Sequence, residues 1–192
     1  ATTGSINDAG DDTTTDFTAG GLITLTAQDE IGGSAAAMVT DTAGAIEFAS
    51  GSSVDVSSTS AGAIVLSGAG ALTLSDVDTV DGAITVTSAG NLVATAVDAA
   101  DAGADATHAV SLTASSGDIT IGAITSDSTL TLTATAGSIN DAGDDTTTDL
   151  TSTTNAIVLT AQDEIGGSAA AMVTDTAGAI EVAGGSALDV SS

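Results

Sequence analysis

The sequence predicts an all-β fold, a parallel β-helix or β-solenoid with about 20 residues per coil. Short apolar-x-apolar segments follow a Gly and a small residue, as in residues 62–66 and 82–86. Four pairs of equivalent apolar residues are 20 positions apart: Ile64 and Ile84, Leu72 and Leu92, Val110 and Leu130, and Ile119 and Ile139. A repeat of about 20 residues that contains several short strands is typical of a solenoid, in which each coil pairs with the coils above and below it.

Each strand is expected to be three to five residues long, to alternate between inside and outside, and to end at Gly, Ser, Asn or Asp. In residues 82–87 the alternation places Ile84 and Val86 inside and Thr85 and Thr87 outside. β-Branched residues on both faces suit a pleated, half-buried surface.

The composition indicates a folded chain with a thin core. The hydrophobic fraction is 42% and the mean hydropathy is +0.39, which a disordered acidic segment would not show. Phe17 and Phe48 are the only aromatic residues, and the chain has no Trp, Tyr, Pro or Cys. A core one or two aliphatic layers wide does not need aromatic volume.

The charge balance excludes several classes of function. The 192 residues include 26 Asp and Glu and no Lys or Arg, which gives a formal net charge of -26. Without cationic side chains the chain is not expected to bind nucleic acid or anionic lipid head groups. No apolar run approaches the roughly 20 residues of a membrane span, so no membrane insertion is expected.

A long internal repeat organises the chain. Residues 4–18 recur as 137–151, and residues 25–49 recur as 159–183, at offsets of 133 and 134. Residues 59–192 therefore form one complete 134-residue repeat, and residues 1–58 are the end of another. We expect residues 1–192 to be one continuous solenoid segment of a longer array, with about seven coils and on the order of 33 Å per repeat.

The repeats resemble those of filamentous haemagglutinin and of giant bacterial surface proteins built from β-strand repeats. Residues 86–92 and 130–139 carry this resemblance, which covers most of the chain as a pattern and not as a catalytic signature. It implies a right-handed parallel β-helix, export to the cell surface, and a role as an adhesin stalk or fibre.

Two groups of acidic residues are candidate Ca²⁺ ligands, because Ca²⁺ prefers a high density of oxygen ligands. The first group lies in an Asn-Asp-x-Gly-Asp-Asp turn and its copy: Asp8, Asp11, Asp12 and Asp16, and Asp141, Asp144, Asp145 and Asp149. The second group is Asp76, Asp78 and Asp81. Neither spacing is that of an EF-hand loop, and the alternative is that these residues only end strands and cap turns.

Residues 95–109 break the rhythm, because the interval from Ile84 to Val110 is 26 residues. Asp98, Asp101, Asp105 and His108 would share one face of a short helix or of an extended loop in this segment. Two interpretations are open. The segment is either a divalent-metal site or a solvated excursion from the solenoid.

Catalysis is not expected, because the chain has no Cys, Lys or Tyr, and Ser-His-Asp chemistry would depend on His108 alone. Outward Thr-x-Thr pairs at residues 24–26, 85–87 and 131–133 suggest binding to ice or to another ordered surface. Such a ladder would be interrupted by Glu47, by Val65 with Ser67, and by Thr120 with Gly122.

We therefore expect a structural, extracellular repeat segment that forms a stalk, fibre or adhesin shaft on a bacterial cell surface. Its expected partners are further copies of the repeat along the axis, and neighbouring fibres through divalent cations. Two alternatives stay open: a Ca²⁺-dependent, immunoglobulin-like adhesin array, and the Thr-ladder surface binder.

Overall fold

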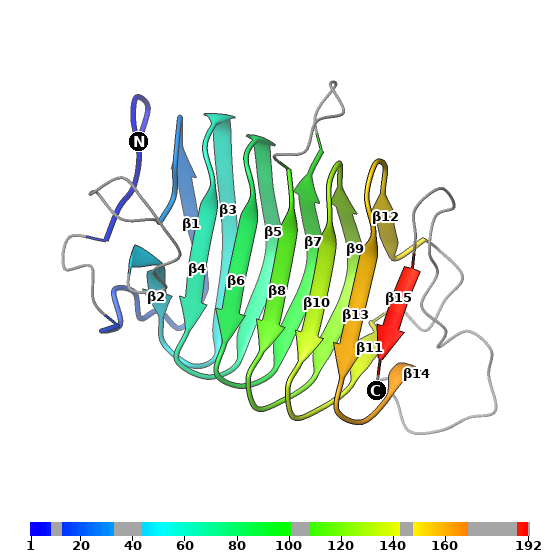
Figure 1. Ribbon diagram of the computed structural model, residues 1–192. Coiled ribbons are helices and arrows are strands. Elements are labelled where there is room, and N and C mark those ends of the chain that lie inside the picture. The colour runs from blue at the N-terminus through cyan, green and yellow to red at the C-terminus, as the bar shows by residue number, and fades with distance from the viewer. Residues whose placement is uncertain (9–12, 33–43, 101–107, 143–147, 169–187, 192) are drawn as a thin grey trace.

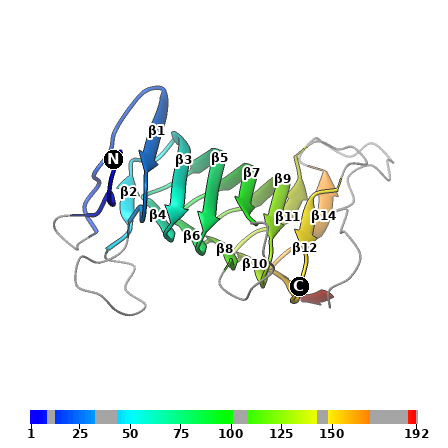
Figure 2. The same ribbon diagram turned by 90° about the horizontal axis from the view of Figure 1, so that it is seen from above.

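The fold is a parallel β-solenoid built from two sheets that run side by side along one axis (Figures 1 and 2). This computed structural model describes residues 1–8, 13–32, 44–100, 108–142, 148–168 and 188–191. Within these residues every strand pair is parallel, which confirms the predicted fold class and contradicts the antiparallel, immunoglobulin-like alternative.

Sheet A, the sheet nearer the viewer in Figure 1, has seven described strands in the order β15-β13-β10-β8-β6-β4-β2. Their bounds are β2 Ile46–Phe48, β4 Ile64–Gly68, β6 Ile84–Ser88, β8 Val110–Ala114, β10 Leu130–Ala134, β13 Ile157–Ala161 and β15 Leu188–Ser191.

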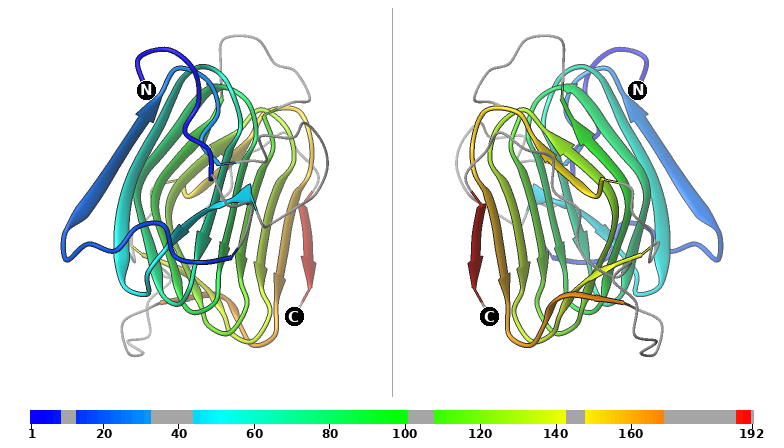
Figure 3. Two further views of the ribbon diagram at one scale, coloured as in Figure 1. Left: turned by 90° about the vertical axis from the view of Figure 1, so that its left-hand side faces the viewer. Right: turned by 90° about the vertical axis from the view of Figure 1, so that its right-hand side faces the viewer.

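Sheet B has eight described strands in the order β1-β3-β5-β7-β9-β11-β14, and β12 pairs with the second half of β9. Their bounds are β1 Leu22–Ala27, β3 Ser52–Ala61, β5 Leu72–Asp81, β7 Leu92–Ala99, β9 Ile119–Ser126, β11 Ile139–Asp141, β12 Leu150–Ser152 and β14 Ile165–Ser168. The chain passes alternately through the two sheets, except that the consecutive strands β11 and β12 both lie in sheet B, and the views along the axis show the stacked coils (Figure 3).

The register confirms the coil length read from the sequence. All four residue pairs that are 20 positions apart are paired across neighbouring strands. Ile84 pairs with Val110, so the 26-residue interval is one longer coil. Other coils are longer still, because Leu130 pairs with Ile157 and Ile23 pairs with Val54. The average coil therefore exceeds 20 residues, and a repeat holds fewer than the seven coils expected.

The core is the aliphatic interior between the two sheets. Ile84, Val86, Leu130 and Leu132 are fully buried, as the alternation predicts. Burial of such side chains stabilises the fold by about 1.5–3 kcal/mol each relative to leaving them exposed. Phe17 stacks on Phe48 with ring centroids 5.7 Å apart.

The predicted strand length of three to five residues is correct for the described strands of sheet A and for β11, β12 and β14 of sheet B, and is too short for the other strands of sheet B. Strands β3 and β5 have 10 residues, and β7 and β9 have 8. In β5, β7 and β9 two consecutive residues outside the core, such as Ser75 and Asp76, separate the buried residues. These outward residues interrupt the alternation and resemble a strand end in the sequence. The pairing with the neighbouring strand has a gap at this point and resumes in register beyond it.

Short polar side chains complete the backbone hydrogen bonding where the chain turns. The buried Ser126 hydroxyl donates to the carbonyl of His108 (2.6 Å), and the buried Ser152 hydroxyl donates to the carbonyl of Ser128 (2.7 Å). The Asp118 carboxylate accepts a bond from the amide of Ser138 (2.8 Å). These contacts satisfy groups that the strand ladders leave open.

In the part of the chain that the structure describes, no helix has the length and apolarity needed to cross a membrane.

Candidate functional site

The outer face of sheet B carries an acidic row across three adjacent strands. The row consists of Asp55 on β3, Asp76 and Asp78 on β5, and Asp98 on β7. Asp55 is in register with Asp76, and Asp78 is in register with Asp98. Carboxylates thus stand on neighbouring coils, at strand spacings of about 4.7–4.9 Å. Like charges in such positions destabilise a sheet unless something offsets them.

The row is electrostatically coupled. The pKa of Asp76 is raised, first by desolvation and then by the charges of Asp78 and Asp55. The pKa of Asp98 is also raised by desolvation and by neighbouring carboxylates, although a hydrogen bond from the amide of Ala100 (2.9 Å) acts in the opposite direction. Asp78 accepts a hydrogen bond from the Ser57 hydroxyl (2.7 Å). Hydrogen bonds therefore hold Asp78 and Asp98 in place, while the carboxylates of the row repel one another.

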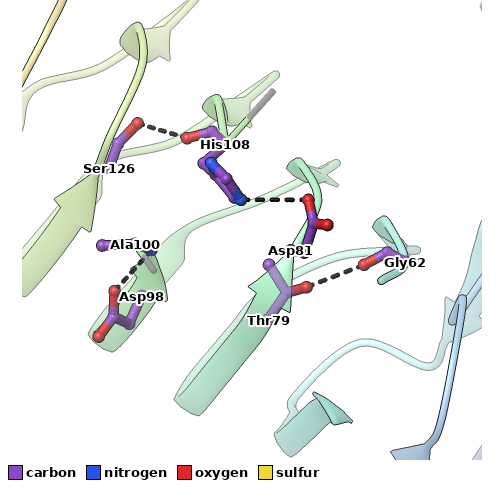
Figure 4. Close-up of polar contacts among 7 residues, drawn as sticks. All are labelled: Gly62, Thr79, Asp81, Asp98, Ala100, His108 and Ser126. Carbon is purple, nitrogen blue, oxygen red and sulfur yellow. Dashed lines mark hydrogen bonds and ion pairs between the residues drawn. The ribbon is translucent and has the colours of Figure 1, made fainter. Parts of the chain in front are cut away.

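Asp81 does not belong to this row, although the sequence groups it with Asp76 and Asp78. It ends β5, and its Oδ1 lies 3.2 Å from Nε2 of His108, which precedes β8 on the next coil (Figure 4). The imidazole is fully buried and the Asp81 side chain is 50% exposed. The pair joins two neighbouring coils at the rim of the solenoid.

His108 thus lies in the wall of the solenoid and not in a solvated excursion. Asp98 lies in β7, so this part of the 95–109 segment is a strand and not the helix considered from the sequence; Asp101 and Asp105 lie outside the described residues. The nearby Ser126 hydroxyl donates to the backbone carbonyl of His108 and not to its imidazole (Figure 4). This geometry gives the imidazole no role in activating that serine.

The outer face of sheet A differs from that of sheet B. From β4 to β13, the outer face of sheet A carries hydroxyl groups and no charged side chain. One column, in register from coil to coil, consists of Ser67, Thr87, Thr113, Thr133 and Thr160. The second column consists of Val65, Thr85, Ser111, Thr131 and Val158.

These columns correct the expected ladder in two ways. The pairs at 85–87 and 131–133 lie on sheet A, whereas the pair at 24–26 lies on β1 of sheet B and does not join them. Thr120 and Gly122 belong to β9 in sheet B, and the buried Glu47 belongs to β2, outside β4–β13. Ser67 continues the first column, whereas the second column has Val65 and Val158 at its two ends.

The first group of candidate ligands is only partly described. Asp8 and its copy Asp141 are buried, and so is Asp149, whereas Asp16 is exposed and accepts a hydrogen bond from the amide of Glu47 (3.0 Å). The remaining four residues lie outside the described residues: Asp11, Asp12, Asp144 and Asp145. Within the described residues no three acidic or imidazole side chains are arranged to hold a metal ion. Calcium binding by either group stays a prediction.

Sequence reasoning missed the partners that the coil places beside each acidic residue. Asp98 joins Asp78 because a coil of 20 residues brings them into register, whereas Asp55 joins Asp76 through the register shift that follows Val54. The spacing from Asp78 to Asp98 was an available signal, since it equals the coil length. The contact between Asp81 and His108 had no such signal, because it spans an irregular coil.

The fold and its surfaces define a parallel β-solenoid with one acidic face and one hydroxyl-bearing face. Comparison of the chain with protein-family models, curated proteins and solved structures finds no match.

Proposed function

We propose that this chain is a structural repeat segment of an extracellular stalk, fibre or adhesin shaft on a bacterial cell surface. One observation carries the proposal: strand pairing continues from coil to coil through the described sheets and is repeated between the two copies of the long repeat. Ile23 pairs with Val54 in one copy, and their equivalents Ile157 and Leu188 pair in the other. A unit of this kind extends along one axis by adding copies.

The charge supports the same role. An acidic surface keeps neighbouring fibres apart in solution and lets divalent cations draw them together. The absence of Lys and Arg also leaves no cleavage site for trypsin-like proteases, which is useful outside a cell. The partners are then further copies of the repeat along the axis and, across the acidic faces, neighbouring fibres.

Electron cryomicroscopy and diffraction of native filaments would test the proposal. We expect a meridional spacing of about 4.8 Å from the stacked coils, and antibodies against the chain should label intact cells. A chain of beads, or labelling that requires permeabilised cells, would contradict it.

A second candidate function is adsorption to an ordered, uncharged surface such as ice, and the hydroxyl columns of sheet A favour it. We expect thermal hysteresis from the isolated chain if this function holds. A Thr113→Leu variant should then lose the effect, whereas Thr120→Leu, on the outer side of sheet B, should keep it. Absence of hysteresis in the unmodified chain would end this candidate.

A further inference from the structure

The two copies of the long repeat occupy opposite sheets. Residues 22–27 form β1 in sheet B, whereas the equivalent residues 156–161 supply β13 in sheet A. The partner strand moves with it, because β1 pairs with β3 in sheet B and β13 pairs with β15 in sheet A. The pairing between the two segments is kept while their sheet changes.

A second pair of segments shows the opposite exchange. Ile6 pairs with Ile31, and Ile31 pairs with Ile64 on β4 of sheet A. The equivalent residues Ile139 and Ile165 pair as β11 and β14 in sheet B. Equivalent hydrogen bonds accompany these pairs, from the amide of Ile6 to Glu30 O (2.9 Å) and from the amide of Ile139 to Glu164 O (2.8 Å).

A third element agrees with this exchange. Phe17 pairs with Phe48 of β2 in sheet A, whereas its copy Leu150 lies in β12 of sheet B.

The exchange follows from the number of coils in a repeat. From β1 to β11, sheet B advances through five coils, in the order β1-β3-β5-β7-β9-β11. The chain then crosses to sheet A and forms β13, the copy of β1, which adds half a coil. One 134-residue repeat therefore holds five and a half coils. At about 4.8 Å per coil, it advances about 26 Å and not the 33 Å expected for seven coils.

The surface chemistry already changes faces within this chain. On sheet B, Thr24 of β1 is in register with Asp55, which begins the acidic row. On sheet A, Val158 of β13 is in register with Asp189 of β15, the copy of Asp55, while the hydroxyl column through Thr160 continues to Ser191. The step from an uncharged strand to an acidic one thus occurs on both sheets, at positions five and a half coils apart.

We infer that consecutive copies of the repeat exchange the two faces of the solenoid, so that each side of an array presents acidic and hydroxyl-bearing segments in alternation. The structural period is then two copies, or about 53 Å. The extension to a fibre rests on the proposed function, but the exchange itself is a property of this chain.

A hydrophobic feature is consistent with this assignment. Leu188 and Val190 of β15 are 52% and 49% exposed, whereas the equivalent Val54 and Val56 of β3 are fully buried. β3 is enclosed because β5 pairs with its other edge, while β15 is the last described strand of sheet A. A copy of β5 seated on β15 would place the next acidic strand on the hydroxyl-bearing side.

Pairs of pyrene-labelled cysteines in the 192-residue chain test the exchange, because the chain has no native Cys. Thr160 is in register with Thr133 if the repeat holds a half-integral number of coils. With an integral number, Thr160 would lie in sheet B, the sheet that contains Asn140 of β11. We expect excimer emission from Thr133→Cys with Thr160→Cys, and none from Asn140→Cys with Thr160→Cys.

Two controls complete the design. The pair Thr26→Cys with Ser57→Cys should give excimer emission, because these residues are in register on sheet B. The pair Thr26→Cys with Thr133→Cys replaces Thr160 by its repeat equivalent and should give none. Singly labelled chains at the same concentration exclude emission between molecules.

Each outcome decides the inference. Emission from the Asn140 pair, or from neither Thr160 pair while the Thr26–Ser57 pair emits, would overturn it. Nitroxide labels at Thr87 and Thr160 give a second measurement that does not need bulky neighbouring labels. These sites are three coils apart on sheet A, which corresponds to about 14 Å between backbones, and a clearly longer separation would also overturn the exchange. Neither experiment requires filaments, so failure of the fibre proposal would remain distinguishable.

Discussion

Buried serines at the turns bond backbone carbonyls and amides that the strand ladders do not reach. Ser126 shows the arrangement most fully, because its hydroxyl donates to the carbonyl of His108 and its oxygen accepts a bond from the amide of Ser128. A small hydroxyl side chain suits this place, since it has both a donor and an acceptor and little volume.

Replacing Ser126 by Ala should lower the free energy of unfolding by about 1–3 kcal/mol, because the two hydrogen bonds made by its buried hydroxyl would be lost. Urea denaturation followed by circular dichroism measures this change. Ser111→Ala is the control, because Ser111 is half-exposed on sheet A and its loss should change the free energy by less than about 0.5 kcal/mol. Equal effects of the two substitutions would contradict the role of Ser126.

Gly32 is a second residue whose identity is required locally. Its φ is +71°, and a Cβ at this position would lie 2.0 Å from the carbonyl oxygen of Val65 on the neighbouring coil. Its copy Gly166 has a φ of +84°, so the same backbone conformation recurs in the other copy. The glycine allows one coil to lie closely on the next.

We expect Gly32→Ala to destabilise the chain by at least about 1–3 kcal/mol, from backbone strain together with the contact at Val65. Gly20→Ala is the matched control, because a Cβ added there would meet no atom within 4 Å and the φ of Gly20 is not positive. Thermal unfolding of both variants measures the difference. A Gly32→Ala chain as stable as the control would show that the coil adapts.

At the scale of the elements, sheet B combines a buried aliphatic face with an acidic outer face. The groups that face Asp76 and Asp98 are themselves carboxylates, since Asp55 and Asp78 act on Asp76, and Asp78, Asp76 and Asp127 act on Asp98. The sequence has no Lys or Arg to offset this repulsion. Backbone pairing and core burial must therefore hold the acidic strands together.

The acidic row predicts that the chain is more stable at mildly acidic than at neutral pH. The pKa values of Asp76 and Asp98 in the folded chain lie above the ordinary value of 3.8. Between pH 3.8 and these raised pKa values, the folded state therefore binds more protons than the unfolded state. The stabilisation is complete below pH 3.8 and is lost as the pH rises through the folded-state pKa values.

An Asp98→Asn variant tests this link. The amide oxygen can still accept the bond from Ala100, while the negative charge is lost. We expect a gain of about 0.2–1 kcal/mol at neutral pH and a flatter dependence of stability on pH. Asp118→Asn serves as the control outside the row. A variant with an unchanged pH profile would contradict the role of the row.

At the scale of the whole molecule, a chain with a thin aliphatic core has a formal net charge of -26. Self-repulsion of this charge opposes the compact state and weakens as salt screens it. The Debye length falls from about 30 Å at 0.01 M to about 8 Å at 0.15 M ionic strength. The stability of the solenoid therefore depends on ionic strength more than that of a chain with balanced charges would.

We expect the urea midpoint of unfolding to rise with NaCl over this range, because screening reduces repulsion among the carboxylates. The same experiment tests the calcium prediction. A specific site would saturate at low CaCl₂ and raise the midpoint beyond MgCl₂ at equal ionic strength, whereas nonspecific screening would give equal curves. A midpoint that falls with NaCl would contradict the importance of repulsion.

Local patterns were sufficient to predict most of the backbone pairing. The spacing of Ile64 and Ile84 predicted their register, because a coil of constant length places equivalent residues beside each other. The alternation also predicted that Ile84 and Val86 are buried. It failed at Ser75 and Asp76, two consecutive residues that lie outside the core within β5. The sequence pattern therefore predicted strands that are too short in sheet B.

The amino-acid sequence alone thus specifies the parallel solenoid, its basic coil of 20 residues, its aliphatic core and the absence of cations. These properties depend on residue types and on spacings between nearby residues. Tertiary structure decides which outward residues become neighbours, including the acidic row, the Asp81–His108 pair and the hydroxyl columns. It also decides the half coil that sends equivalent segments to opposite sheets. The reason is that the coils differ in length. The sheet in which a segment lies therefore depends on the lengths of all the coils that precede it.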